Sequence, residues 1–307
     1  MSGRRLRVGA RPSRLSQAQT SMVVELIKNS SEGLEIETVP VKTSGDRLPP
    51  EARGSTGGKG AFTLDIEKLL LKKEIDVAVH SMKDLPSTLT AGLEIGATPQ
   101  RSDPRDALLS KDGRTLDALG RGARVGTGSL RRKAQLMKMR PDLDVVDIRG
   151  NVDTRIRKIA SGFDAIVLAA AGLERIGESG RISQLFSIEE MVPAVGQGVI
   201  AVEMRRGDAS VAKILSKIDD RAARIESSCE RAFIERLGGD CYVPIGGCAR
   251  VSGDSVTMVG LIASEDGRRV VRRSTSSPSS DAIRLGRLVA ESLLDAGGEK
   301  ILAGAAS

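Results

Sequence analysis

Short apolar runs alternate with longer amphipathic stretches along the first hundred residues. Runs of about four to eight residues predict strands, at Leu6–Ala10, Leu34–Val41, Ile75–His80 and Leu93–Ala97. Helical spacing of apolar residues predicts helices over Ser13–Ile27 and Phe62–Lys72. Between these elements, Thr43–Gly60 is rich in Gly, Pro and charge and has no periodicity. A segment of that length is either disordered or a functional lid.

From about Asp103 the chain alternates between strand and helix. The predicted strands lie at Val125, Val145–Ile148 and Ala165–Leu168. Each is followed by a predicted helix, at Ser129–Met139, Asn151–Ala160 and Ala170–Ile176. This alternation is typical of a parallel α/β sheet.

The last part of the chain, from about Ala222, has a different order of elements. We expect a helix, three strands and a helix, at Ala222–Leu237, Ala249–Ser252, Ser255–Ala263, Arg269–Ser274 and Asp281–Ala296. Strands that follow one another closely pair as hairpins, so this order predicts a small α+β domain with an antiparallel sheet. With 307 residues, the chain is long enough for two or three domains.

Composition excludes several classes of protein. Hydrophobic residues make up 40% and charged residues 28%, and no apolar run approaches the roughly 20 residues of a membrane helix. The N-terminal arginines are not followed by an apolar signal core, so we expect a cytoplasmic protein. Three widely spaced cysteines do not form a disulfide framework. With His80 as the single histidine and no C-x-x-C, we expect no metal site, and His80 itself has the pattern of a structural residue.

The net charge of +7 favours an anionic partner. Nucleic acid is one such partner, but only 2% of residues are aromatic, and single-strand binders usually stack bases on aromatic side chains. The cations are also scattered in ones and twos beside Gly, Ser and Thr instead of forming a basic run. That distribution favours discrete carboxylates or phosphates, and we expect neither a nucleic-acid nor a membrane partner.

Basic and hydroxyl side chains follow three predicted strands. In chain order they are Arg11 and Ser13, then Thr127, Ser129, Arg131 and Arg132, then Arg149 and Arg155. Ligands of open α/β sheets bind at the carboxyl ends of strands, where the amino ends of the following helices favour anions. Arg binds carboxylates through two parallel hydrogen bonds. A single arginine of this kind is often only a solvated surface charge, but the recurrence indicates a site for an anion with several carboxylates.

Two further residues are candidates for chemistry. Asp84 follows the strand that ends at His80, where a carboxylate can act as general acid or base or stabilise a developing cation, or can simply cap a turn. Cys241 lies between glycines and a proline, so it is predicted on a tight loop, as a nucleophile or as an ordinary thiol. Gly57–Gly60 lacks the spacing of a phosphate loop and favours a lid with Lys59 at its tip.

Taken together, these segments resemble the porphobilinogen deaminase (hydroxymethylbilane synthase) family. The similarity covers nearly the whole chain in order. Its main motifs are Asp76-x-Ala78-Val79-His80-Ser81-Met82-Lys83-Asp84, Asp103-Pro104-Arg105-Asp106, Val125-Gly126-Thr127-x-Ser129-Leu130-Arg131-Arg132, Arg149-Gly150-Asn151-Val152, Pro193-Ala194-Val195-Gly196-Gln197-Gly198 and Cys241-x-Val243-Pro244-Ile245-Gly246. An ordered series of this length is far more specific than any one of its members.

The resemblance implies a fold and a division into domains. Two α/β domains similar to the halves of a type-II periplasmic binding protein would hold the active site in the cleft between them, and a small α+β domain would complete the chain. The first domain would comprise residues 1–99 with 197–217, the second 100–196 and the third 218–307. A monomer is the expectation.

The resemblance also implies the reaction. Four porphobilinogens would be joined head to tail, with ammonia released at each step, and hydrolysis would then free 1-hydroxymethylbilane for tetrapyrrole biosynthesis. The cofactor would be a dipyrromethane primer, held by a thioether to Cys241. Asp84 would be the catalytic residue, because a carboxylate beside the pyrrole nitrogens stabilises the cation that deamination generates.

Matches to the family motifs assign roles to the remaining residues. Cofactor-binding residues would be Lys83, Thr127, Ser129, Arg131, Arg132, Arg149 and Arg155. Substrate-binding residues would be Arg11, Ser13, Gln19, Phe62, Arg149, Arg155 and Arg175, with Lys59 at the lid. The chain departs from the family pattern at four positions, Arg14, Gly128, Asp240 and Tyr242. The main rival hypothesis is a two-lobed anion-binding protein without enzymatic activity, which explains the arginines but leaves Asp84 and Cys241 without a role.

Overall fold

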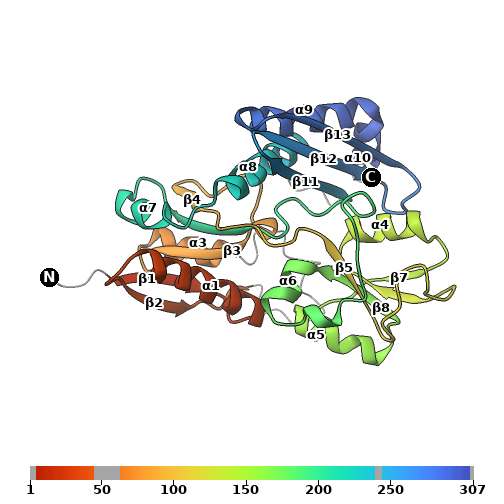
Figure 1. Ribbon diagram of the computed structural model, residues 1–307, viewed down its shortest axis with the longest axis horizontal. Helices are drawn as coiled ribbons and strands as arrows, with labels where there is room; N and C mark the ends of the chain where they lie inside the picture. The colour runs from red at the N-terminus through yellow and green to blue at the C-terminus, as the bar shows by residue number, and fades with distance from the viewer. Residues whose placement is uncertain (1–4, 45–62, 239–243, 305–307) are drawn as a thin grey trace. The chain divides into compact units, whose positions relative to one another are not determined.

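The computed structural model describes residues 5–44, 63–238 and 244–304, and the chain divides into two compact units (Figure 1). The first unit comprises Met1–Ser102 with Val199–Arg224, and the second Asp103–Gly198 with Ile225–Ser307. Each is built around its own hydrophobic core. The predicted lid, the loop with Cys241 and residue Phe62 lie outside the described residues.

The first unit is a five-stranded mixed sheet in the order β2-β1-β3-β10-β4. Its strands are β1 (Arg5–Ala10), β2 (Glu35–Pro40), β3 (Val77–Ser81), β4 (Leu93–Ala97) and β10 (Ile200–Arg205). The four strands predicted from the apolar runs are confirmed. The apolar pattern did not predict β10, which returns from much later in the chain to pair antiparallel with both β3 and β4.

Helices cover both faces of this sheet. They are α1 (Arg14–Ser30), α3 (Leu64–Leu71) and α7 (Ala209–Leu215). Val23 and Ile27 of α1 and Val211 of α7 share a buried cluster with β1, β3 and β10, whereas Ile66 and Leu70 of α3 pack in a second cluster with Ala78. Because side chains of a strand alternate between faces, α3 covers the face to which Ala78 points and α1 the opposite face.

The second unit contains a five-stranded sheet in the order β7-β6-β8-β5-β9. Its strands are β5 (Asp106–Ser110), β6 (Arg124–Gly126), β7 (Asp144–Val146), β8 (Ala165–Ala169) and β9 (Gln184–Leu185), and its helices are α4 (Leu130–Met139), α5 (Val152–Lys158) and α6 (Ala170–Arg175). The predicted parallel arrangement is confirmed for β6, β7 and β8. It is incomplete, because β5 runs antiparallel to β8 and β9 pairs antiparallel with β5.

The C-terminal part of the second unit is the predicted helix, antiparallel sheet and helix. Its elements are α8 (Arg221–Arg236), β11 (Ile245–Ser252), β12 (Ser255–Ala263), β13 (Val270–Pro278), α9 (Ala282–Leu293) and α10 (Glu299–Gly304). Phe233 of α8 and Val289 of α9 are buried in its core. Two carboxylates of α8 bind backbone N–H groups at the edge of β11. Glu230 accepts a hydrogen bond from the N–H of Ala249 at 2.8 Å, and Glu226 accepts one from the N–H of Val251 at 3.0 Å.

This C-terminal sheet packs on α4. Ala134 of α4 shares a buried cluster with Val259 and Leu261 of β12. The turn between β12 and β13 approaches the helix so closely that a Cβ at Gly267, whose φ is 68°, would overlap the carbonyl oxygen of Ala134. Glycine is therefore required there both for its backbone conformation and for its lack of a side chain.

This close approach predicts the effect of adding a methyl group at two glycines. Gly267→Ala should lower the free energy of unfolding by about 3 kcal/mol, because it combines left-handed backbone strain of about 1–2 kcal/mol with overpacking of about 1–3 kcal/mol. Gly253 is the matched control, since it also has a positive φ of 57° but no atom within 4 Å of its Cβ position. Gly253→Ala should cost only the strain. Urea unfolding of both variants measures the difference, and equal costs would contradict the packing argument.

Candidate functional site

Asp84 lies in a short turn at the carboxyl end of β3. The turn is a 3₁₀ helix over Met82–Asp84. Its flanks are fixed, because Met82 and Leu85 are buried and the N–H of Met82 donates to the carbonyl of Val199 at 3.0 Å. Asp84 itself is exposed. The fold thus anchors the neighbours of this carboxylate and leaves the carboxylate accessible.

A small pocket beside this turn brings together four of the predicted site residues. Arg11, Ser13, Gln19 and Asp84 all line it, and its volume is about 60 Å³. They come from the end of β1, the first part of α1 and the end of β3, which is the edge where ligands of open α/β sheets bind. The pocket is small, so within this unit it admits one small group of a ligand and not a whole molecule.

Hydrogen bonds fix the walls of this pocket. Ser13 is the N-cap of α1, and its hydroxyl accepts a hydrogen bond from the N–H of Ser16 at 3.3 Å. Gln19 is buried and donates from Nε2 to the hydroxyl of Ser81 at 2.9 Å. The amide therefore locks the first turns of α1 to the last residue of β3. Lys83, in the same turn as Asp84, is half-buried.

In the second unit, the predicted hydroxyls lie at the start of α4. Ser129 is the N-cap and its hydroxyl accepts a hydrogen bond from the N–H of Arg132 at 3.4 Å. The hydroxyl of Thr127 accepts one from the N–H of Ser129 at 3.3 Å. Both residues shape the loop between β6 and α4, and the amino end of this helix favours an anion.

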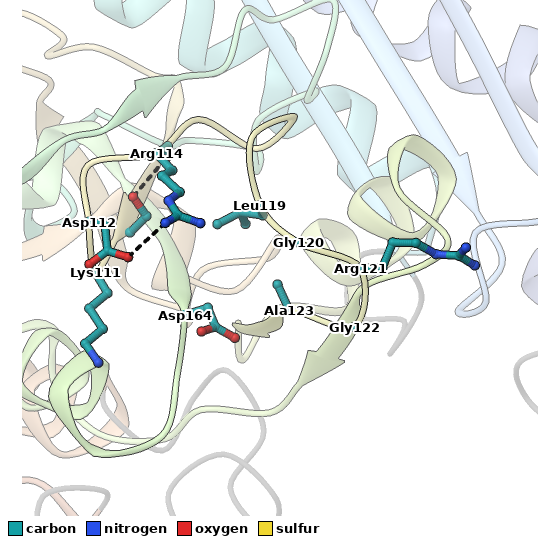
Figure 2. Close-up of a pocket in the computed structure, with 10 residues that line it drawn as sticks. Lys111, Asp112, Arg114, Leu119, Gly120, Arg121, Gly122, Ala123 and Asp164 are labelled. Atoms are coloured by element: carbon teal, nitrogen blue, oxygen red, sulfur yellow. Dashed lines mark hydrogen bonds and ion pairs between the residues drawn. The ribbon is translucent and has the colours of Figure 1, made fainter.

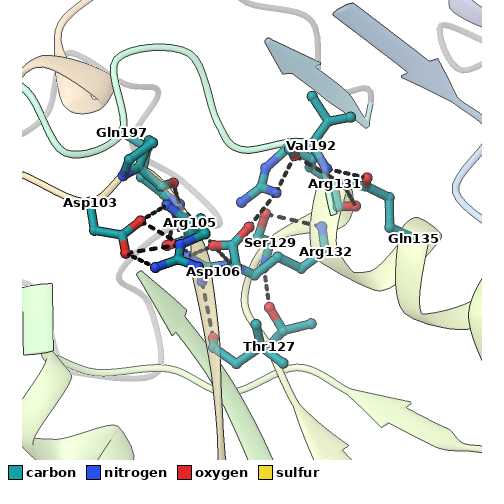
Figure 3. Close-up of polar contacts among 12 residues, drawn as sticks. Asp103, Arg105, Asp106, Thr127, Ser129, Arg131, Arg132, Gln135, Val192 and Gln197 are labelled. Atoms are coloured by element: carbon teal, nitrogen blue, oxygen red, sulfur yellow. Dashed lines mark hydrogen bonds and ion pairs between the residues drawn. The ribbon is translucent and has the colours of Figure 1, made fainter. Parts of the chain in front are cut away.

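Arg131 and Arg132 are buried and paired with a carboxylate that the sequence analysis did not single out (Figure 3). Nη1 of Arg131 donates to Oδ2 of Asp106 at 2.7 Å, and Nε of Arg132 donates to Oδ1 at 2.8 Å. Arg131 also donates to the carbonyl of Val192 at 2.7 Å, and Gln197 donates to Asp106 at 2.9 Å. These guanidinium groups belong to the interior of the second unit instead of lying on its surface.

The charges in this cluster do not balance. Two guanidinium groups face one carboxylate, and Nε of Arg131 is buried with no hydrogen-bond partner among the described residues. Burial by itself raises the pKa of Asp106, but the charges of the two arginines and the hydrogen bonds from Arg131 and Gln197 outweigh it, so the pKa lies well below its ordinary value. With Asp106 ionised, two guanidinium groups against one carboxylate leave an excess of positive charge, which favours a further anion.

Arg149 and Arg155 lie on the loop between β7 and α5 and at the first turns of that helix. Nε of Arg149 donates to Asp147 at 2.5 Å and Nε of Arg155 to the carbonyl of Gly150 at 2.7 Å. Both side chains are half-buried. Gly128 is one of the departures from the family pattern. A Cβ at this position would lie 2.9 Å from the carbonyl oxygen of Ile148, so the backbone here leaves no room for a side chain.

Arg175 ends α6 and is held by the backbone. Its Nη2 donates to the carbonyl of Gly198 at 2.6 Å. Burial lowers the pKa of Arg175 to about 10, which leaves it protonated at neutral pH. It is therefore available as a cation. Arg14, another departure from the family pattern, is exposed as the first residue of α1.

A larger pocket, in the second unit, is lined by none of the predicted site residues. It has a volume of about 290 Å³ and lies where β5 ends and β6 begins, at the opposite end of the parallel strands (Figure 2). Its cations do not converge: Arg114 pairs with Asp112 at 3.7 Å, and Arg121 points away from the other lining side chains in Figure 2. This pocket carries no functional assignment.

Several predicted residues lie outside the described ranges. Lys59, Phe62 and Cys241 are among them, as are the departures Asp240 and Tyr242. Within the described ranges, no three His, Cys, Asp or Glu residues lie close enough together to hold a metal ion. In the same part of the chain, no helix has the length and apolar character to cross a membrane.

Comparisons with known proteins place these features in a family. The family model described as "Porphobilinogen deaminase, dipyromethane cofactor binding domain" matches residues 6–213, and that described as "Porphobilinogen deaminase, C-terminal domain" matches residues 224–295. Among solved structures, the methionine binding protein MetQ covers 70% of this chain and 88% of its own, at 15% identity and a TM-score of 0.44.

Curated relatives match over nearly the full length of both chains. The porphobilinogen deaminase of Roseiflexus sp. (strain RS-1) is 48% identical over 298 residues, which are 97% of this chain and 98% of the relative. That of Brevibacillus brevis is 46% identical over 299 residues, which are 97% of this chain and 96% of the relative. Since two models and these relatives together span nearly the whole sequence, the chain belongs to the porphobilinogen deaminase family.

Proposed function

We propose that this chain joins four porphobilinogen molecules head to tail, releases one ammonia at each step, and frees 1-hydroxymethylbilane by hydrolysis. The observation that carries the proposal is the pocket in which Asp84 lies with Arg11, Ser13 and Gln19. An acid and a cation that line one small pocket suit a ligand that places one carboxylate there and also carries a basic amine. Porphobilinogen is such a molecule, since its pyrrole ring bears acetate, propionate and aminomethyl groups.

Asp84 is the residue to which we assign the chemistry. Each condensation breaks a carbon–nitrogen bond and forms a carbon–carbon bond, so a proton must reach the departing amine and another must leave a pyrrole carbon. An accessible carboxylate can hold a proton at one oxygen and place negative charge beside a pyrrole N–H as positive charge develops. The buried neighbours Met82 and Leu85 keep that carboxylate in position.

Arg11 and Ser13 are the proposed binding residues for the carboxylates of the incoming substrate. Arg11 supplies planar, bidentate donors at the end of β1, and Ser13 lies at the amino end of α1, where the helix dipole favours an anion. Gln19 supports the pocket through Ser81. Arg175 and Phe62 complete the proposed substrate-binding set, with Lys59 at the lid.

The donors at the start of α4 suit the acid groups of a dipyrromethane. Thr127 and Ser129 offer hydroxyls there, and Arg149 and Arg155 are half-buried cations. Arg131 and Arg132 together carry more positive charge than Asp106 neutralises. The buried Nε–H of Arg131 also has no hydrogen-bond partner within the described ranges. Both features support the binding of one more carboxylate. We propose that these residues and Lys83 hold the cofactor, attached through Cys241. When bound, the dipyrromethane supplies the pyrrole end to which each unit is added.

We propose three domains, of residues 1–99 with 197–217, 100–196 and 218–307, in which the last two pack together through α4 and β12. We further propose a cytoplasmic monomer with no nucleic-acid or membrane partner. The rival function, an anion-binding protein without enzymatic activity, leaves Asp84 without a role in its pocket.

The first prediction concerns the covalent cofactor. The intact mass of the native protein should exceed the mass of its sequence by one dipyrromethane, and Cys241→Ser should abolish this increment. Cys229→Ala is the matched control: burial, and then the Glu230 carboxylate, raises the pKa of Cys229 to about 12, so its thiol is unreactive and its loss should leave the increment intact. An active preparation with the unmodified mass would refute the thioether.

The second prediction concerns Asp84. Asp84→Asn should lower kcat by about 100-fold or more, because the amide neither carries charge nor exchanges a proton. Since Asp84 is exposed, the free energy of unfolding should change by no more than about 0.5 kcal/mol. Asp112→Asn removes an exposed carboxylate from the pocket of Figure 2 and should leave kcat unchanged. The measurement is the steady-state turnover of porphobilinogen by both variants. Near-normal turnover by the Asp84 variant would assign the catalytic role to another residue.

The third prediction concerns the carboxylate that fixes α4. Asp106→Asn should destabilise the protein by about 3–5 kcal/mol, because it leaves two buried guanidinium groups without their counter-charge. Asp103→Asn breaks a pair with Arg105 that is partly exposed to solvent, and should cost no more than about 1 kcal/mol.

The pH dependence of that destabilisation follows from the direction of the pKa shift. The folded-state pKa of Asp106 is lowered, so its stabilisation is fully present above the unfolded-state pKa of about 3.9 and is lost as the pH falls below it. Urea unfolding should therefore show a constant gap between the wild type and Asp106→Asn from pH 7 to about pH 5. The gap should narrow below about pH 4, and a gap that widens with acidification would contradict the assignment.

A further inference from the structure

The last two residues of β3 are held by polar partners on opposite faces of the sheet. Ser81 bonds to Gln19 of α1 on one face. On the other, Nε2 of His80 lies 3.2 Å from Oε2 of Glu203 on β10. Asp84 follows three residues later in the same chain segment, so both contacts act on the strand end from which its turn begins.

Glu203 is unusual because its acidic side chain lies in the protein interior. It is fully buried, and within the described residues neither its carboxylate oxygens nor Nε2 of His80 makes a hydrogen bond, so the 3.2 Å approach between them is a close polar contact. In the β3–β10 register Glu203 lies opposite Ala78, which makes it a diagonal neighbour of His80 on the face covered by α3. The other buried carboxylate on that side is Glu67 of α3, and it is bound by the hydroxyl of Thr90 instead.

Burying these two groups costs stability that an apolar pair would not cost. A buried carboxylate is strongly unfavourable unless a partner compensates it, and His80 lies within reach of Glu203. Replacing such pairs with apolar residues of similar volume is often neutral or stabilising. Stability alone therefore does not account for the pair, whereas a buried polar contact between β3 and β10 opposes displacement of one strand relative to the other.

We propose that His80 and Glu203 form a positioning pair for Asp84. The proposal rests on the function proposed above. The contact holds the end of β3 against β10. The neighbouring hydrogen bond from the N–H of Met82 to the carbonyl of Val199 then fixes the turn that carries Asp84 relative to the same strands. His80 also lines the pocket, but in this role it acts through the placement of the Asp84 carboxylate.

The test separates position from stability with a double variant. His80→Leu/Glu203→Met replaces both partners with apolar side chains and should retain a thermal midpoint within a few degrees of the wild type. Its kcat for porphobilinogen should nevertheless fall about 10- to 100-fold, because a displacement of about 1 Å in a catalytic group has effects of this size. KM should change less than about threefold, since Arg11 and Ser13 are untouched. A stable double variant with wild-type kcat would overturn the proposal.

Single variants keep the test decisive if the double variant does not fold. Glu203→Gln preserves length and an acceptor for Nε2 of His80, so its kcat should stay within about threefold of the wild type, whereas Glu203→Met should lose about 10-fold or more. Equal kcat values for the two would overturn the positioning role. Glu67→Met is the matched control, because it removes a buried carboxylate from the same side of the sheet that is hydrogen-bonded to Thr90 instead of lying against His80, and it should retain wild-type kcat.

The wild type is measured first under the same conditions. If it neither consumes porphobilinogen nor carries the added mass of a dipyrromethane, the proposed function fails and the variants are not compared. If the wild type is active and the double variant equals it, only the positioning pair fails.

Discussion

The carboxylate of Asp106 is the charge on which the arrangement of the second unit depends. It is fully buried at the start of β5 and receives hydrogen bonds from both arginines of α4 and from Gln197. The backbone next to Gln197 continues this network, because the N–H of Gly196 donates to Glu230 of α8 at 2.5 Å, and Glu230 in turn binds the edge of β11. One buried anion therefore joins the sheet, the helix above it and the C-terminal strands into a single unit.

Sequence periodicity predicted most of the helices and strands because most of them follow simple rules. The helix α1 begins at the N-cap Ser13 and α4 at the N-cap Ser129, and both boundaries were visible as a hydroxyl residue before an amphipathic run. The antiparallel C-terminal sheet also follows from closely spaced strands. Periodicity missed β5, β9 and β10. The strand β9 has only two residues, whereas β5 and β10 each carry a fully buried carboxylate, Asp106 or Glu203. A charged residue in an otherwise apolar run weakens the signal by which a buried strand is predicted.

The same limit applies to the site. The sequence identified Arg11, Ser13, Gln19 and Asp84 by motif, and the fold brings them to one pocket because β1, α1 and β3 are adjacent. It identified Arg131 and Arg132 as cations but not as buried ones, since their partner Asp106 lies on a strand whose pairing depends on the tertiary fold. The contact of His80 with Glu203 escaped notice for the same reason: the two residues are distant in the chain, and only the β3–β10 register makes them neighbours.

Asp106 and Glu203 occupy comparable positions in the two sheets. In each unit one buried acidic residue belongs to a strand that runs antiparallel to its neighbour, and its partners lie close to the edge where the proposed functional residues gather: α4 in the second unit and the end of β3 in the first. Apolar packing fixes a strand mainly by shape and tolerates small displacements, whereas a buried polar contact is satisfied only within a narrow range of distance and angle. The proposed reaction, in which the same Asp84 would act at each of several condensations, needs the second kind of constraint. The cost in stability of burying Asp106 and Glu203 is thus consistent with a requirement for position.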